Sequence, residues 1–280
     1  MSDDAEYVLG TGDDELQRLA LQNRLWSDTA VAAWRRAGLR AGDRVLDVGC
    51  GPGHASCDLA QLVMSRGRVV GIDESAGFVA HTETMAARRG LPWLSACCGD
   101  VQQLAELFAH GALCDEAPFD FAYARWVLCF VPDPESVVRG IAAALRPGGR
   151  LVVHDYFHYA SMTMAPKRDS HDRAVAATVR SWRAHGGDPD VAGRLPALFA
   201  AHGLRLDEVR THVRVARGGD TMFAWPDTWW RTYAPKLVAM GELTQADCDQ
   251  LIADLEAIQG GEGFVQCPPV YELIATREQG

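Results

Sequence analysis

Short apolar runs alternate with amphipathic stretches along the first 155 residues. Residues 12–37 carry apolar side chains at helical spacing, which predicts two short helices. Five short apolar runs follow, separated by stretches of helical spacing, and each has the length of a strand. They occupy residues 43–48, 67–72, 92–98, 119–124 and 149–155. Strands that alternate with helices form a parallel sheet through right-handed crossovers, so the pattern predicts an α/β fold.

The pattern changes after residue 155. Residues 157–182 have helical spacing and are rich in aromatic side chains and methionine. Residues 205–216 and 265–276 alternate between apolar and polar positions, which predicts two further strands. Residues 218–263, between those strands, form a second insertion that is predicted to be mostly helical. The second half of the chain therefore adds two insertions to the alternating core.

The segment Val45–Ser56, VLDVGCGPGHAS, joins an apolar strand to a glycine-rich turn and then to a helix. Gly49, Gly51 and Gly53 can adopt positive φ, and the start of the helix offers unpaired N–H groups to a ligand. The dinucleotide fingerprint G-x-G-x-x-G fails because its third glycine position is His54. The segment therefore predicts a site for a nucleotide-like cofactor other than a nicotinamide dinucleotide.

A carboxylate closes the next apolar strand, in the segment VVGIDES at residues 69–75. Asp73 lies 20 residues beyond Gly53 (73 − 53), where a carboxylate can accept hydrogen bonds from both hydroxyls of a ribose. Together with Asp47 and the glycine turn, this segment resembles the first two motifs of class I S-adenosylmethionine-dependent methyltransferases. Three more segments, which contain Asp100, Arg125 and His154, resemble later motifs of that family in the same order.

The resemblance implies S-adenosylmethionine as cofactor and S-adenosylhomocysteine as its product. In the family, an acidic residue at the position of Asp100 accepts a hydrogen bond from the adenine amino group. The cofactor-binding residues implied by the motifs are Asp47, Gly49, Cys50, Gly51, Gly53, Asp73, Glu74, Asp100, Val101 and Arg125.

The resemblance also implies a Rossmann-like, mostly parallel sheet of seven strands, closed by an antiparallel hairpin. We expect one catalytic domain with an N-terminal helical cap and helical lid insertions. The expected parts are the cap at 1–40, the cofactor-binding core at 41–155, a lid insertion at 156–202, and closing strands at 203–280 with the helical insertion 218–263. A weaker resemblance to bacterial small-molecule methyltransferases of natural-product type covers nearly the whole chain.

The two insertions are expected to determine the substrate, because ligands of such sheets lie beyond the carboxyl ends of the strands. Both insertions are rich in aromatic residues, among them Trp182, Trp225 and Trp229, which favours an apolar or aromatic small molecule. Residues 156–217 carry ten Lys and Arg against six acidic residues, although the whole chain has a net charge of −10. An anionic acceptor is therefore also compatible with the sequence.

A sulfonium methyl group is already activated, so positioning of the acceptor can supply on the order of 7–11 kcal/mol of the catalysis. A general base is needed only if the acceptor must lose a proton, and His154 and His158, just past the fifth strand, are the candidates. Arg125 stands where metal-dependent relatives place a carboxylate ligand. We therefore expect no metal, and Arg125 is a candidate for binding the methionine carboxylate or the acceptor.

The sequence thus predicts methyl transfer to a small-molecule acceptor, at oxygen or nitrogen rather than carbon. A cofactor-dependent rearrangement without methyl transfer and a non-catalytic binding subunit remain as alternatives, because the same motifs serve all three. The acidic net charge argues against nucleic-acid binding. With no long apolar run and no paired-cysteine motif, we expect a cytoplasmic monomer or homodimer without a membrane partner.

Overall fold

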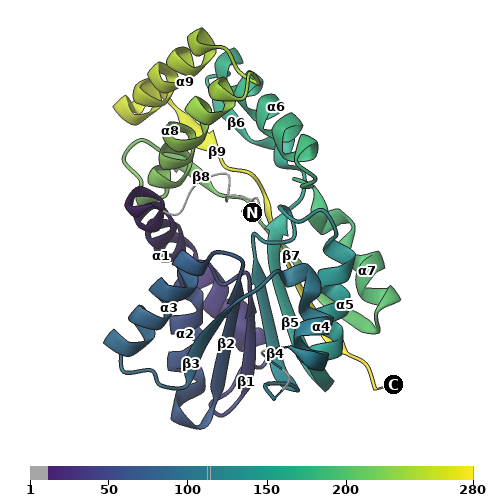
Figure 1. The fold of residues 1–280 in the computed structure, drawn as a ribbon. Helices are drawn as coiled ribbons and strands as arrows, with labels where there is room; N and C mark the ends of the chain where they lie inside the picture. Colours follow the sequence, from purple (N-terminus) through teal and green to yellow (C-terminus); the bar gives the residue numbers. More distant parts are fainter. Residues whose placement is uncertain (1–11, 112, 114, 280) are drawn as a thin grey trace, which may run out of the picture.

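The computed structural model describes residues 12–111, 113 and 115–279 (Figure 1). Its main sheet has seven strands in the order β3-β2-β1-β4-β5-β10-β7. Neighbouring strands are parallel except where β10 pairs with β5 and β7. The strands are β1 (Arg44–Val48), β2 (Arg68–Asp73), β3 (Leu94–Cys98), β4 (Phe119–Arg125), β5 (Leu145–Tyr156), β7 (Leu204–His212) and β10 (Val270–Arg277). The predicted mostly parallel, seven-stranded fold is confirmed.

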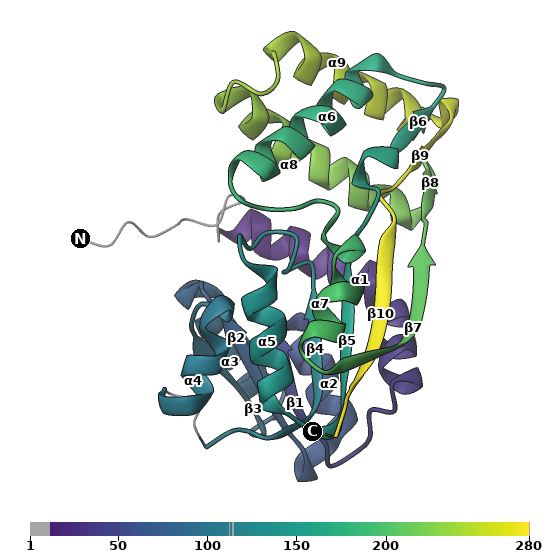
Figure 2. The same cartoon turned by 90° about the vertical axis from the view of Figure 1, so that its right-hand side faces the viewer.

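Helices cover both faces of this sheet (Figure 2). One face packs against α1 (Asp13–Arg36), α2 (His54–Val63) and α3 (Ala76–Arg88), and the other against α4 (Leu104–His110), α5 (Pro134–Ala144) and α7 (Leu195–Ala201). Successive residues of a strand point to opposite faces. In β1, Val45 therefore joins the core under α1 and α2, whereas Leu46 joins the core under α5. The same alternation determines to which face of the sheet the polar side chains of β4 and β5 point.

The predicted pair of short N-terminal helices is wrong. Residues 13–36 form one continuous helix of 24 residues, α1. No glycine or proline interrupts this stretch. Acidic residues in its first turn and arginines in its last turn interact favourably with the dipole of one helix that spans the whole stretch. The first 11 residues of the expected cap at 1–40 lie outside the described residues.

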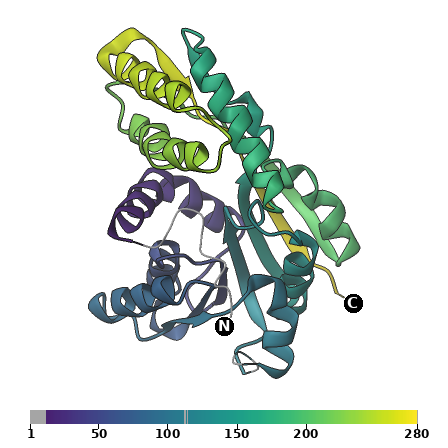
Figure 3. The ribbon, with the colours of Figure 1, turned by 45° about the horizontal axis from the view of Figure 1, so that its top comes forward.

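Three helices and a small sheet form a cap beyond the carboxyl ends of the parallel strands (Figure 3). The helices are α6 (Asp169–Ala184), α8 (Ala224–Ala239) and α9 (Gln245–Ala257), which contact one another. The sheet consists of β6 (Thr163–Ala165), β9 (Phe264–Gln266) and β8 (Val215–Arg217) in antiparallel pairing. Helix α8 also contacts α1, so the cap and the N-terminal helix enclose the same end of the main sheet.

The small sheet corrects the sequence interpretation of the second half. The two strands predicted at 205–216 and 265–276 are each divided, and their parts belong to different sheets, β7 with β8 and β9 with β10. Pro268 and Pro269 explain the second division, because proline has no N–H for a ladder. The first insertion, predicted as helical from residue 157, also contributes strand β6.

Among the described residues, no helix combines the length and the apolar character that crossing a membrane requires.

Candidate active site

A cavity of about 250 Å³ lies between the carboxyl ends of the parallel strands and the cap. Nine of the ten predicted cofactor residues line it, and the exception is Gly53. One half of the wall is acidic and comes from the ends of β1 and β2 and the turn after β3. The other half is aromatic and comes from the segments after β4 and β5 and from helices α6 and α8. The structure thus brings both insertions to the site that the glycine turn forms.

The glycine turn approaches its neighbours more closely than other residues would allow. Gly49, Gly51 and Gly53 have φ of 64°, 54° and 79°, the left-handed region that glycine adopts without strain. A Cβ on Gly49 would lie 2.3 Å from the side chain of Val127, and a Cβ on Gly53 would collide with Thr82. The turn therefore presents backbone, with little side chain, to the acidic half of the cavity.

Asp73 connects this turn to the end of β2. Its Oδ2 accepts a hydrogen bond from the Gly51 N–H at 2.8 Å, and its Oδ1 accepts one from the Ser75 N–H at 3.0 Å. A carboxylate oxygen has more than one lone pair, so both oxygens can still accept from a ligand. Burial raises the pKa of Asp73 and is also the main cause of the raised pKa of the neighbouring Glu74.

Two further aspartates complete the acidic half. Asp100 accepts a hydrogen bond from the Gln102 N–H at 2.8 Å, which fixes its carboxylate at the start of a short 3-10 helix that begins with Val101. Asp47 is 2% exposed and accepts a hydrogen bond from the Ser56 hydroxyl at 2.5 Å. Burial raises the pKa of Asp47 to about 6. Hydrogen-bond acceptors beside an open glycine turn fit the ribose and adenine of a nucleoside.

Arg125, the last residue of β4, lies where the two halves meet. Its Nη2 donates a hydrogen bond to Asn23 Oδ1 of α1 at 2.7 Å, and its guanidinium carbon lies 5.1 Å from the centre of the Trp126 ring. Its Nη1 is buried and has no hydrogen-bond partner among the described residues. The second arginine on the wall, Arg18, already forms an ion pair with Glu15 at 2.6 Å. Arg125 is therefore the arginine that can receive an anionic ligand group.

The aromatic half is held by ring contacts. Trp126 stacks on Tyr156 with the ring centres 6.1 Å apart, and its ring also lies 5.9 Å from that of Trp225. Tyr159 and Trp182 extend this group, with their ring centres 5.1 Å apart. Trp126 has φ of 54°, a strained value for a non-glycine residue, which persists only where the surrounding structure imposes it.

Asp155 holds the loop that carries Trp126. Its Oδ2 accepts a hydrogen bond from the Cys129 N–H at 3.2 Å, and its Oδ1 accepts one from its neighbour's backbone, Tyr156 N–H, at 2.9 Å. Burial raises the pKa of Asp155 to about 6. Asp155 is therefore part of the support of the aromatic half and does not line the cavity.

The structure does not bring the two predicted base candidates to the cavity. His154 is 2% exposed and points to the face of the sheet under α1, because strand alternation turns it away from Asp155. Its Nδ1 lies 3.2 Å from the Tyr123 hydroxyl. His158 is exposed and has φ of 59° in the turn after β5. His154 lies within β5, near its end, rather than past the strand as predicted, and His158 lies in the turn after it.

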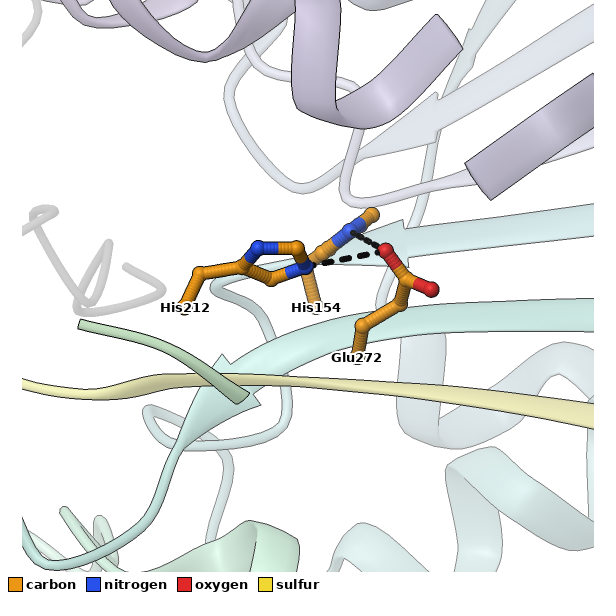
Figure 4. A group of neighbouring side chains, drawn as sticks. All are labelled: His154, His212 and Glu272. Carbon is orange, nitrogen blue, oxygen red and sulfur yellow. Dashed lines mark hydrogen bonds and ion pairs between the residues drawn. The ribbon is translucent and has the colours of Figure 1, made fainter. Parts of the chain in front are cut away.

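His154 belongs to a polar group with the buried Glu272 and the partly buried His212 (Figure 4). Glu272 Oε2 lies 3.2 Å from His154 Nε2 and 3.1 Å from His212 Nε2, and Arg36 forms an ion pair with the same carboxylate. Burial is the main cause of the lowered pKa of His154. Although these three side chains have ligand types found around metals, Arg36 already balances the Glu272 charge, so the group is satisfied by the chain itself.

Several cavity residues were not among the predicted site residues, and His54 is one of them. His54, the first residue of α2, lines the cavity beside the glycine turn, and its Nε2 is buried without a hydrogen-bond partner among the described residues. In the sequence, His54 excludes the nicotinamide dinucleotide fingerprint, and no binding role was predicted for it. Its place directly after the last glycine of the turn was the signal that could have identified it, because helix N-termini face the ligand in such turns.

Comparison with known proteins gives a family match over the core. Residues 39–189 match a family model described as a methyltransferase domain. A demethylmenaquinone methyltransferase of Beutenbergia cavernae is 34% identical over 158 residues, covering 55% of this chain and 59% of that protein. A trans-aconitate 2-methyltransferase of Deinococcus radiodurans is 28% identical over 160 residues, covering 56% and 55%. The chain spans between 30% and 64% of the length of the curated relatives that it matches.

Solved structures share the fold at low sequence identity. The geranyl diphosphate C-methyltransferase of Streptomyces coelicolor A3(2) has a TM-score of 0.53 and 15% identity to this chain, covering 91% of this chain and 77% of that one. The three names specify a quinone, an organic acid and an isoprenoid diphosphate. The shared fold therefore does not determine the acceptor.

Proposed function

Because this chain belongs to the methyltransferase domain family, with the fold and motifs of the class I S-adenosylmethionine-dependent enzymes, we propose that it methylates a small molecule. The observation that carries the proposal is a cavity whose acidic half, on the glycine turn, is continuous with an aromatic half under the cap. Such a cavity can hold a nucleoside-containing cofactor and an apolar acceptor end to end. The methyl acceptor is proposed to be an oxygen or a nitrogen.

The family and the acidic half support S-adenosylmethionine as the cofactor. Asp73 would accept hydrogen bonds from the ribose hydroxyls, Asp100 would accept one from the adenine amino group, and the Arg125 guanidinium would bind the methionine carboxylate. When bound, this cofactor supplies a methyl group on a positively charged sulfur. The remaining cofactor contacts would come from the backbone of Gly49 to Gly51 and from Glu74 and Val101.

The aromatic half favours a flat, apolar or aromatic acceptor. Its wall presents the rings of Trp126, Tyr156 and Trp225 and the side chain of Met162, which offer large contact surfaces and few charges. Arg125, at the border of the two halves, can also attract an acceptor with an anionic group. A quinone or phenol-like ring with one polar substituent has this combination of properties.

We propose that catalysis rests on positioning rather than on an imidazole base from residue 154 or 158. The cap and α1 lie over the cavity, where they would limit the access of water and hold the acceptor in line with the transferred group. His154 would act from beneath the site, because its hydrogen bond to Tyr123 supports the part of β4 that carries Arg125. His158 is exposed and does not line the cavity, so it is not placed to accept a proton from the acceptor.

Transfer of an isotope-labelled methyl group tests the proposal. The full-length protein is incubated with S-adenosylmethionine carrying a 13C methyl group and with a panel of phenols, quinols and aromatic amines, and the products are analysed by mass spectrometry. We expect label in at least one acceptor and formation of S-adenosylhomocysteine in the same amount. Binding of S-adenosylhomocysteine without any transfer would favour a rearrangement or a binding subunit. Failure to bind it, together with binding of NAD, would contradict the cofactor assignment.

A further inference from the structure

Two ionisable side chains on the cavity wall each carry a buried polar atom without a hydrogen-bond partner among the described residues. These atoms are Arg125 Nη1 and His54 Nε2. Arg125 ends β4 and His54 begins α2, so they approach the junction of the two halves from different elements. A buried polar atom without a partner is costly, and in a ligand cavity such atoms indicate a ligand group that pairs with them.

The groups around His54 disfavour its protonation while the cavity holds no anion. Burial is the largest cause that lowers the pKa of His54, to about 4, followed by the nearby His81, Arg125 and Arg89. His81 and Arg89 come from α3 and its C-terminal end, and Arg125 comes from β4. His54 is therefore a neutral imidazole near neutral pH.

Two carboxylates on neighbouring positions of the fold are engaged elsewhere. Asp58, one turn along α2, accepts a hydrogen bond from Asn23 at 3.2 Å and lies 3.9 Å from Arg89. Asp47, on β1, accepts the hydrogen bond from Ser56. Neither carboxylate forms an ion pair with His54 among the described residues. An anion beside both His54 and Arg125 would have to come from a ligand.

We propose that His54 and Arg125 together bind the carboxylate of the methionine part of the cofactor, and that His54 takes up a proton from solvent when this carboxylate binds. The inference rests on the proposed function, because it requires S-adenosylmethionine or S-adenosylhomocysteine in the cavity. One carboxylate oxygen accepts from Arg125 Nη1, since Asn23 already engages Nη2, and the other accepts from His54 Nε2. Only a proton is added to the imidazole, and no covalent bond of the ligand changes.

The direction of the pH effect follows from the two states of His54. A carboxylate beside the imidazole favours the charged form, so the pKa of His54 is higher in the complex than in the free protein. Between these two pKa values, binding is coupled to proton uptake, and affinity rises as the pH falls, by at most about tenfold per pH unit. Well above this window no proton is taken up.

Isothermal titration calorimetry of the full-length protein tests the coupling. S-adenosylhomocysteine is titrated at pH 5.5 and pH 8 in buffers of different ionisation enthalpy, and the number of protons taken up follows from the buffer dependence of the binding enthalpy. We expect uptake of about 0.3 to 1 proton at pH 5.5 and nearly none at pH 8. Titration of 5′-methylthioadenosine, which lacks the amino-acid part, should show much less uptake at pH 5.5.

Matched variants assign the proton to His54. His54→Asn keeps a side-chain N–H donor but does not titrate, so we expect it to lose most of the uptake and to bind S-adenosylhomocysteine about threefold to tenfold more weakly at pH 5.5. Its affinity at pH 8 should lie within about twofold of the wild type. His81→Asn changes the neighbouring imidazole, whose Nδ1 already contacts the Pro52 carbonyl at 2.9 Å, and should retain the uptake. Asp47 also titrates near pH 6, but it is present in the wild type and in both variants. Proton uptake that differs between the wild type and His54→Asn is therefore assigned to His54.

Equal proton uptake in the wild type and in His54→Asn would overturn the inference while leaving the cofactor assignment intact. Equal uptake with S-adenosylhomocysteine and with 5′-methylthioadenosine would also overturn it, because the carboxylate would then not be the anion involved. Absence of any binding of S-adenosylhomocysteine at pH 8 would instead contradict the proposed function, so the two failures are distinguishable.

Discussion

The acidic and aromatic halves of the cavity are built in different ways. The acidic half comes from residues 47–101, where successive parallel strands end side by side and backbone hydrogen bonds fix the turn, as between Gly51 and Asp73. The aromatic half joins segments far apart in sequence, from Trp126, directly after β4, to Trp229 on α8, through ring contacts. A cofactor site made of strand ends is rigid, whereas a substrate site made of packed side chains can vary while the fold stays the same.

Substitution of a tryptophan in the cap should give the largest effect on stability. Trp230 is fully buried in α8 and packs against His171 of α6, so Trp230→Ala should cost about 3–5 kcal/mol of local stability. We expect amide protons of α6 and α8 to lose protection in hydrogen exchange, while those of β1, β4 and β5 keep it. The matched variant Trp34→Ala, in the core under α1, should lower protection throughout the main sheet. Equal loss in both regions for both variants would show that the cap has no separate stability.

Removal of the carboxylate of Asp73 should give the largest effect on cofactor affinity. Two charge-assisted hydrogen bonds to a ribose, each worth about 1.5–3 kcal/mol, predict that Asp73→Ala weakens S-adenosylhomocysteine binding by at least about tenfold. Asp100→Ala should have a smaller effect, since the adenine amino group can bond to water instead. Calorimetry gives both affinities, and thermal unfolding checks that each variant is folded. An unchanged affinity of Asp73→Ala would mean that the acidic half does not bind the ribose.

The buried carboxylate of Asp155 should make stability depend on pH. Its pKa in the folded protein is about 6, above the usual value of 3.8, so the folded state favours the protonated form and loses stability as the pH rises through this window. The asparagine of the variant Asp155→Asn does not ionise, so the variant does not lose this stability as the pH rises. The difference in free energy of unfolding between variant and wild type should therefore shift by about 1 kcal/mol in favour of the variant between pH 5 and pH 7.5. Urea unfolding at the two pH values measures it, and a shift of opposite sign would contradict the burial argument.

Ligand binding should protect the two halves unequally. Residues 156–182 and 218–233, which carry part of the aromatic half, must let product leave, so we propose that they order over bound ligands. Binding of S-adenosylhomocysteine should increase the protection of these segments from hydrogen exchange. The change in the free energy of their local opening should be smaller than the changes that the substitutions above produce. If their protection is the same with and without the ligand, they do not act as a lid.

The sequence predicted the acidic half far better than the aromatic half. The glycine turn and Asp73 are local signals, since a turn and a strand end are formed by consecutive residues. The strands of the core were predicted to within a few residues, apart from the early start of β5 at Leu145, because each is a short apolar run between polar or glycine residues. The small sheet was not predicted: β6 gave no such signal, and β8 and β9 lie at the ends of ranges that were each predicted as one strand, because strands this short are defined by their partners in the cap.

Side-chain direction at strand ends was the second limit of prediction. His154 lies within β5 rather than past it, and strand alternation points it toward Glu272, whereas a turn at positive φ after the strand leaves His158 exposed. His54 reached the cavity because its helix begins at the glycine turn. Position along the chain therefore located the strand ends, whereas the choice among the histidines depended on backbone geometry that only the structure shows.

A crystal structure of the protein with S-adenosylhomocysteine tests directly whether the acidic half binds the cofactor and the aromatic half the acceptor. We expect the ribose hydroxyls on Asp73, the adenine beside Asp100, the carboxylate between Arg125 and His54, and the sulfur facing the rings of Trp126 and Tyr156. A nucleoside bound in the aromatic half, or an amino-acid part pointing away from Arg125, would contradict the assignment of the two halves.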